Sequence, residues 1–196
     1  MKLVVLNVAH PFARVCPDAL GGAEQVVARL DAALSRLGHE SFVMACEGSV
    51  TEGILLATPK SANPQVAAER QRIHAQYRYT LQTFLEKWPI DLIHMHGLDF
   101  YEYLPAPGIP VLVTLHEPVE RYPETIFRLE RPQTFLQCVS ASQYASCPHC
   151  SNLLPAMDED SCLFLYERLV NEARAAETFE TEASGDVPEQ ESVVHA

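Results

Sequence analysis

The feature that most constrains the fold is a series of short apolar runs separated by segments with helical periodicity. The first run, "KLVVLNVA", is continuously apolar, which is typical of a strand buried on both faces of a parallel sheet. Comparable runs follow in this order: "SFVMACE", "GILLATPK", "IDLIHMHG", "IPVLVTLHE" and "TFLQCVSAS". Strands that alternate with helices pair in parallel through right-handed crossovers. The pattern therefore predicts an α/β fold with a doubly wound parallel sheet.

Two segments between these runs have the periodicity of amphipathic helices. One begins after two adjacent glycines and stops at Gly38, and its apolar residues share one face: Val26, Val27, Leu30, Ala33, Leu34 and Leu37. A longer helix is predicted after Pro64. A chain of 196 residues, 47% of them hydrophobic, is long enough for one such domain and short for two.

The end of the chain differs from the body. Residues 157–177 predict an amphipathic helix with a narrow apolar stripe, whereas residues 178–196 are polar and acidic and predict a disordered tail. Residues 158–196 carry 11 acidic side chains and two arginines, so most of the formal net charge of −12 falls here. The body is nearly neutral, which argues against nucleic acid or an anionic membrane as the main partner, because both require a basic face.

The six cysteines favour free thiols in a reducing compartment over a disulfide framework. No apolar stretch approaches the roughly 18 residues of a membrane span, so a cytoplasmic protein is expected. Cys147 and Cys150 form a single C-x-x-C, "CPHC", and a structural zinc site needs a second pair of ligands. We expect no metal and no other cofactor, but a small metal-binding protein built on this pair stays an alternative.

Two adjacent glycines, Gly21 and Gly22, stand where the first strand and its loop lead into a helix. Glycines let other atoms approach the backbone closely, and the start of a helix offers unpaired N–H groups with a partial positive charge. This combination favours an anion. A flexible turn before an ordinary helix is the alternative. The dinucleotide-binding pattern G-x-G-x-x-G and the P-loop are both absent from the sequence.

Three predicted strands are followed by histidine, namely His10, His96 and His116, and Glu117 stands next to the last of them. Parallel strands direct their carboxyl ends to the same edge of the sheet, where open α/β folds bind ligands. We therefore expect these side chains to converge with the paired glycines on one crevice. Such a crevice suits a phosphate-bearing, polyhydroxylated ligand.

Four stretches in this order and spacing resemble the N-terminal domain of glycosyltransferase family 4: "GGAEQVVARLDAALSRLGHES", "DLIHMHG", "PVLVTLHE" and "FLQCVSAS". Family members are retaining enzymes of the GT-B architecture, which has two Rossmann domains. The resemblance covers residues 1 to about 146 and implies a single Rossmann-like, acceptor-side domain over residues 1–156. It also implies that "MDEDSCLFLYERLVNEA" is the family's final helix, which crosses back onto the N-terminal domain.

The resemblance also implies roles for individual residues. Gly21 and Gly22 match the loop that lies against the donor diphosphate and the acceptor, and His96 matches a position near the cleft. His10, taken from the strand-end pattern, is expected with them at the donor-phosphate loop. His116 matches a histidine close to the transferred sugar. Glu117 stands where the family commonly has Asp. His116 and Glu117 are therefore the expected catalytic residues.

In the family, a C-terminal Rossmann domain holds the nucleotide, and this sequence contains no counterpart of it. The expected function is therefore a glycosyltransferase-like N-terminal domain, incomplete or inactive alone, with hexosyltransferase-type activity left open. Its expected partners are a nucleotide-sugar or sugar acceptor, bound weakly, and a partner chain that supplies the donor half. A non-catalytic sugar- or protein-binding module is an alternative.

Overall fold

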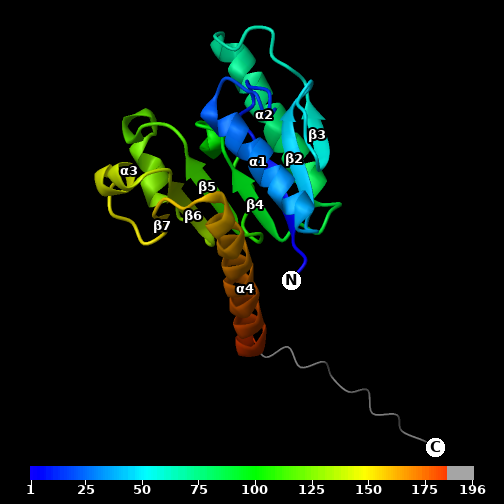
Figure 1. The fold of residues 1–196 in the computed structure, drawn as a ribbon. Coiled ribbons are helices and arrows are strands. Elements are labelled where there is room, and N and C mark those ends of the chain that lie inside the picture. The colour runs from blue at the N-terminus through cyan, green and yellow to red at the C-terminus, as the bar shows by residue number, and fades with distance from the viewer. Residues whose placement is uncertain (185–196) are drawn as a thin grey trace, which may run out of the picture.

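A computed structural model describes residues 1–184 (Figure 1). Seven parallel strands form one sheet in the order β3-β2-β1-β4-β5-β6-β7. The strands are β1 (Val4–Val8), β2 (Glu40–Cys46), β3 (Ile54–Thr58), β4 (Leu92–Met95), β5 (Val111–Leu115), β6 (Thr134–Cys138) and β7 (Leu153–Leu154). The predicted parallel, doubly wound α/β fold is confirmed. The sequence analysis did not predict β7, which is only two residues long.

The helices of the described chain are α1 (Gly22–Arg36), α2 (Ala67–Leu85), α3 (Ala141–Ser146) and α4 (Glu159–Ser184). Three short 3-10 helices lie at Phe100–Glu102, Val119–Arg121 and Glu124–Arg128. The second α-helix begins at Ala67, a few residues later than predicted, because Asn63 to Val66 form a turn closed by a backbone hydrogen bond of 3.0 Å. No helix within residues 1–184 has the length and apolar character needed to span a bilayer.

The order of the strands decides which helix covers which face. The chain steps from β1 to β2 in one direction and from β3 to β4 in the other, so right-handed crossovers place α1 and α2 on opposite faces. The steps from β4 through β7 run in the same direction as the second crossover, and their connections lie on the α2 face. The other face of β4 and β5 is therefore left without a crossover helix.

Helix α4 covers this part of the sheet (Figure 1). Tyr166, Leu169 and Val170 of α4 join Leu92 of β4 and Leu112 of β5 in one buried cluster, which also contains residues of α1. The helix continues through residues 178–184, where the sequence had predicted a disordered tail, because Ala and Glu in "ARAAETFETEAS" are good helix formers. The rest of that predicted tail, residues 185–196, lies outside the described residues.

Candidate functional site

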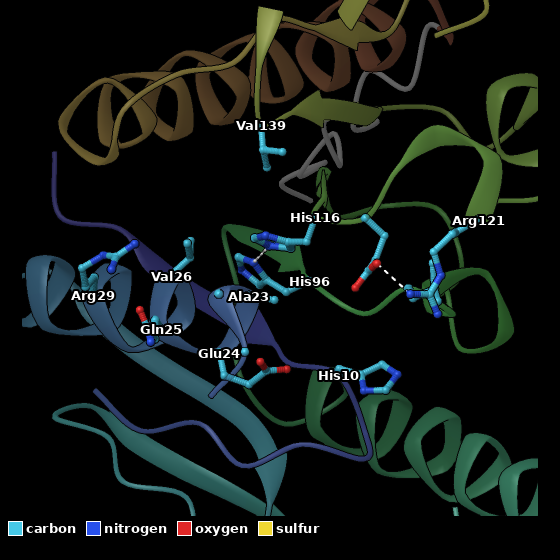
Figure 2. A pocket seen from close by; sticks show the side chains of 14 residues that line it. His10, Ala23, Glu24, Gln25, Val26, Arg29, His96, His116, Arg121 and Val139 are labelled. Carbon is cyan, nitrogen blue, oxygen red and sulfur yellow. Dashed lines mark hydrogen bonds and ion pairs between the residues drawn. The ribbon is translucent and has the colours of Figure 1, made fainter. Parts of the chain in front are cut away.

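A crevice of about 460 Å³ opens where β1, β4 and β5 end (Figure 2). The order of the strands reverses between β1 and β4, and this switch point is where doubly wound sheets bind ligands. All six site residues predicted from the sequence line the crevice: His10, Gly21, Gly22, His96, His116 and Glu117. The structure also adds lining residues that the sequence analysis did not name, among them Glu24, Arg29 and Arg121.

The paired glycines form the wall of the crevice at the start of α1. Gly21 has ordinary extended dihedral angles, φ −88° and ψ 137°, and precedes the first turn without a side chain to cap it. A Cβ atom added to Gly22 would meet nothing within 4 Å, and one added to Gly21 would meet only the flexible end of Glu24. Neither backbone conformation nor packing therefore requires glycine at position 22. The missing side chains leave the N–H groups of the first turn accessible from the crevice.

His96 and His116 contact each other across the floor of the crevice (Figure 2), with 3.1 Å between Nδ1 of His96 and Nε2 of His116. Burial lowers the pKa of His96 well below its ordinary value and lowers the pKa of His116 to about 4, so both rings are neutral near pH 7. Nε2 of His96 lies 3.3 Å from Oδ1 of Asn7 and donates to it. Nδ1 of His96 therefore accepts from His116, whose own Nδ1 is left as an unprotonated acceptor.

Glu117 lines the crevice and pairs with Arg121. Nη1 of Arg121 lies 2.9 Å from Oε2 of Glu117, and 58% of the Arg121 side chain and 40% of the Glu117 side chain are exposed. Exposed ion pairs contribute little to stability, so this carboxylate can exchange its partner for a ligand at low cost. The sequence analysis missed Arg121, although the opposite charges four residues apart in "EPVER" were a signal for the pair.

The buried carboxylate of Asp99 lies close to the ring of His10 and orients it. Nε2 of His10 lies 3.7 Å from Oδ1 of Asp99, which also accepts a hydrogen bond of 3.1 Å from the Tyr103 hydroxyl. The other carboxylate oxygen pairs with His74 and lies 3.6 Å from Arg70. Burial lowers the pKa of His10, against the opposing influence of Asp99. These contacts fix one wall of the crevice.

A row of buried polar side chains continues from the crevice along the face of the sheet covered by α1 and α4. Nδ1 of His94 contacts the hydroxyl of Tyr166 in α4, and Nε2 lies 2.7 Å from Oγ1 of Thr114. The Thr114 hydroxyl donates to Oε1 of Gln137 over 3.1 Å. The sequence analysis missed this row. The sequence contains a signal for it, because each of these residues is a polar side chain within an apolar strand and is the second-to-last residue of that strand. Alternate residues of a strand point to the same face, so all three lie on one face of the sheet.

The cysteines of "CPHC" lie on the other face of the sheet, next to β6. Sγ of Cys138 is 3.7 Å from Sγ of Cys147. Burial raises the pKa of Cys138 to about 12 and also raises the pKa values of Cys147 and Cys150, so these thiols are protonated near pH 7. Among the side chains that the structure describes, no three of His, Cys, Asp or Glu are arranged to hold a metal ion.

Comparisons with known proteins agree with this architecture. The model of Glycosyltransferase Family 4 matches residues 20–149, which is more than half of the chain. The chain therefore belongs to glycosyltransferase family 4. A search of curated proteins finds no significant match.

Two solved structures are similar to this chain, and the first of them shares its fold. A glycosyltransferase from Rickettsia africae ESF-5 has a TM-score of 0.54 and 13% identity, over 79% of this chain and 42% of that one. AviGT4, a glycosyltransferase involved in Avilamycin A biosynthesis, has a TM-score of 0.47 and 20% identity, over 78% of this chain and 41% of that one. The chain thus spans less than half the length of either structure.

Proposed function

We propose that this domain forms the acceptor side of a sugar-transfer site and contacts the phosphate-bearing end of a glycosyl donor. The observation that carries the proposal is the crevice itself, in which an uncapped, glycine-lined helix start faces His116 at the switch point of the sheet. Membership of glycosyltransferase family 4 supports the same assignment.

The lining groups suit the two parts of such a ligand. A phosphate would accept hydrogen bonds from the first-turn N–H groups of α1, near the positive end of the helix dipole. The neutral ring of His116 would accept a hydrogen bond from a sugar hydroxyl through Nδ1. Glu117 would exchange Arg121 for a hydroxyl group of the same ligand.

Sugar transfer also requires a nucleotide-binding half, which we expect from another domain or a partner chain. Without it, this chain should bind nucleotide-sugars weakly, because each missing charge-assisted hydrogen bond removes about 1.5 to 3 kcal/mol. A cytoplasmic site of action fits six free cysteines.

Nuclear magnetic resonance tests the proposal directly. Glucose 1-phosphate is titrated into the chain while the ring signals of His96 and His116 and the amide signals of Gly22 and Ala23 are followed. We expect saturable shifts in the wild type and their loss in Gly22→Val, whose side chain enters the open space at the glycine wall.

Ala67→Val is the matched control, because Ala67 is exposed and is the first residue of α2, as Gly22 is of α1. This variant should shift like the wild type. Absence of shifts in the wild type, or equal shifts in Gly22→Val, would contradict a phosphate contact at this wall.

A further inference from the structure

A second cavity of about 460 Å³ adjoins the crevice, between α1 and the beginning of α4. We call it the α1–α4 cavity. Val26, His116 and Val139 line both spaces, so the two cavities are neighbours that share a wall. The other lining residues are Leu30 of α1, the polar residues of β4 to β6, Cys138, and three residues around the start of α4: Met157, Asp158 and Cys162. Its volume falls within the range of about 300 to 1,000 Å³ that is typical of ligand pockets.

The polar floor of this cavity has a defined hydrogen-bond direction. Burial lowers the pKa of His94 well below its ordinary value, so its ring is neutral and has one donor and one acceptor. The Thr114 hydroxyl donates to Gln137, so Nε2–H of His94 donates to Thr114 and Nδ1 accepts from Tyr166. The chain of hydrogen bonds therefore begins at α4 and ends at Oε1 of Gln137.

The side-chain amide nitrogen of Gln137 has no hydrogen-bond acceptor in this network. The residue is 4% exposed, and its oxygen accepts from Thr114 and, over 3.9 Å, from the thiol of Cys162. Among the side chains that the structure describes, none accepts a hydrogen bond from this nitrogen. Among the described side chains, the fully buried polar atoms without a hydrogen-bond partner are Asn7 Nδ2, Thr58 Oγ1 and the Tyr77 hydroxyl, and the amide nitrogen of Gln137 is not one of them. It is therefore open to the cavity that Gln137 lines.

A buried amide donor without a protein acceptor is unusual, because most buried polar groups in native proteins are paired. The remaining lining groups indicate what kind of acceptor fits. Among the described side chains, the lining contains no lysine or arginine, and Asp158, whose pKa is lowered by hydrogen bonds from Ser161, supplies an ionised group. This charge disfavours an anion but can accept from hydroxyl groups. Val26, Leu30 and Met157 provide apolar walls for C–H surfaces.

We propose that the α1–α4 cavity binds an uncharged, hydroxylated group with the chemistry of a sugar ring, which accepts from the Gln137 amide and donates to Asp158. Its position beside the crevice makes it the site for the sugar portion of the acceptor, and this role alone rests on the proposed function. The proposal that a neutral glycoside binds in the cavity rests only on the residues that line it.

The test follows the side-chain amide signals of Gln137 and the backbone signals of Met157 and Cys162. The probes are the methyl glycosides of glucose, galactose and mannose, with glucose 1-phosphate as the anionic comparison. We expect at least one neutral glycoside to shift these signals saturably. Met157→Trp should weaken that binding by about tenfold or more, because the larger ring occupies the cavity and leaves the polar floor intact.

Phe164→Trp is the matched control, since Phe164 is 74% exposed on α4 and does not line the α1–α4 cavity. It should bind like the wild type. Gln137→Met is a second variant of similar length that removes the amide donor, and it should lose the binding as well. Its folding is checked by thermal unfolding, because the Thr114 hydroxyl loses its acceptor.

The outcomes separate this site from the proposed function. Shifts at His116 with glucose 1-phosphate, but none at Gln137 with any neutral glycoside, would overturn the cavity site and retain the proposed function. Shifts at Gln137 with a neutral glycoside, but none at the glycine wall with glucose 1-phosphate, would support the cavity and overturn the phosphate contact. Equal glycoside binding by Met157→Trp and wild type would place the glycoside elsewhere and overturn the cavity site.

Discussion

Helices α1 and α4 cover the same face of the sheet, but they begin in different ways. The first turn of α4 is capped by its own chain, since the Ser161 N–H donates to Oδ1 of Asp158 over 2.7 Å. The first turn of α1 follows two glycines and has no side-chain cap. A capped start satisfies the N–H groups internally, whereas an uncapped start at a crevice leaves them for a ligand. We infer that the N–H groups at the start of α4 serve the fold, whereas those at the start of α1 are available for binding.

The two helices also differ in how the chain brings them to the sheet. Helix α1 follows β1 directly, and its buried residues pack on β1 and its neighbours. Helix α4 comes from the end of the described chain and places the Tyr166 hydroxyl on His94, 72 residues away in sequence. The packing of β4 and β5 on this face therefore depends on a long-range contact that no local pattern specifies.

The largest effect is expected from removing α4. A chain cut after Ala156 exposes the apolar surface beneath Leu165, Tyr166, Leu169 and Val170. Burial of each such side chain contributes roughly 1.5 to 3 kcal/mol, and their sum is comparable with the 5 to 15 kcal/mol of net stability typical of a domain. We expect this truncation to show no cooperative thermal unfolding by circular dichroism.

A cut after Glu177 is the control, because it keeps every buried residue of α4 that the structure describes. Its melting temperature should lie within a few degrees of the full chain. If both truncations unfold like the full chain, α4 does not stabilise the sheet, and the distinction between the two helices fails.

The next largest effect is expected from acid. The pKa values of His94, His96 and His116 are lowered in the folded protein, mainly by burial, while in the unfolded chain they lie near 6.5. Above about pH 6.5 these histidines are neutral in both states, so their titration does not change the free energy of unfolding. As the pH falls below that value, the unfolded chain binds protons that the folded chain does not, at a cost of roughly 1.4 kcal/mol per pH unit for each histidine.

Urea unfolding between pH 4.5 and 8 measures this dependence. The free energy of unfolding should fall steeply between pH 6.5 and 4.5 and change little above pH 7. His116→Gln should reduce the slope by about one proton in that window. A flat profile would mean that these rings are solvated, contrary to the buried network at the crevice.

An intermediate effect is expected from Tyr166→Phe. The change keeps the ring in the core but removes the hydroxyl, so Nδ1 of the buried His94 loses its partner. An unsatisfied buried group costs about 1 to 3 kcal/mol, which urea unfolding resolves. Tyr79→Phe is the control, since Tyr79 is 72% exposed on α2, and it should change stability by less than about 0.5 kcal/mol. Equal effects of the two variants would show that the contact between α4 and His94 adds nothing.

The sequence was sufficient to predict the sheet and the crevice, for a physical reason. The strands are short apolar runs with clear ends, and parallel strands direct those ends to one edge. The residues after β1, β4 and β5 therefore had to meet the glycines at the start of α1, wherever the rest of the chain went. All six residues predicted for the site line one crevice, and their roles there stay predictions.

The contacts that fix those residues could not be predicted in the same way. Asp99 meets His10, His74 and Arg70 only after α2 and the loop beyond β4 are packed together. The partner of His94 comes from α4, and nothing near His94 in sequence indicates it. The sequence analysis predicted disorder for residues 178–184 because they are acidic, although their Ala and Glu residues favour the helix that the structure shows.

The smallest effect on stability is expected from Gly22→Ala, and it distinguishes a glycine kept for a ligand from one kept for the fold. The added Cβ meets nothing within 4 Å, and Gly22 already has helical geometry, so stability should stay the same or rise by up to about 1 kcal/mol. Gly53→Ala is the matched comparison, because its Cβ would overlap the backbone carbonyl of Ser41 and the carboxylate of Asp31. That variant should lower the melting temperature clearly. If Gly22→Ala were as destabilising as Gly53→Ala, the glycine at the start of α1 would be a requirement of folding, and the uncapped helix would lose its distinction from α4. If Gly22→Ala is stable but weakens the response to glucose 1-phosphate, Gly22 is needed for ligand binding and not for folding.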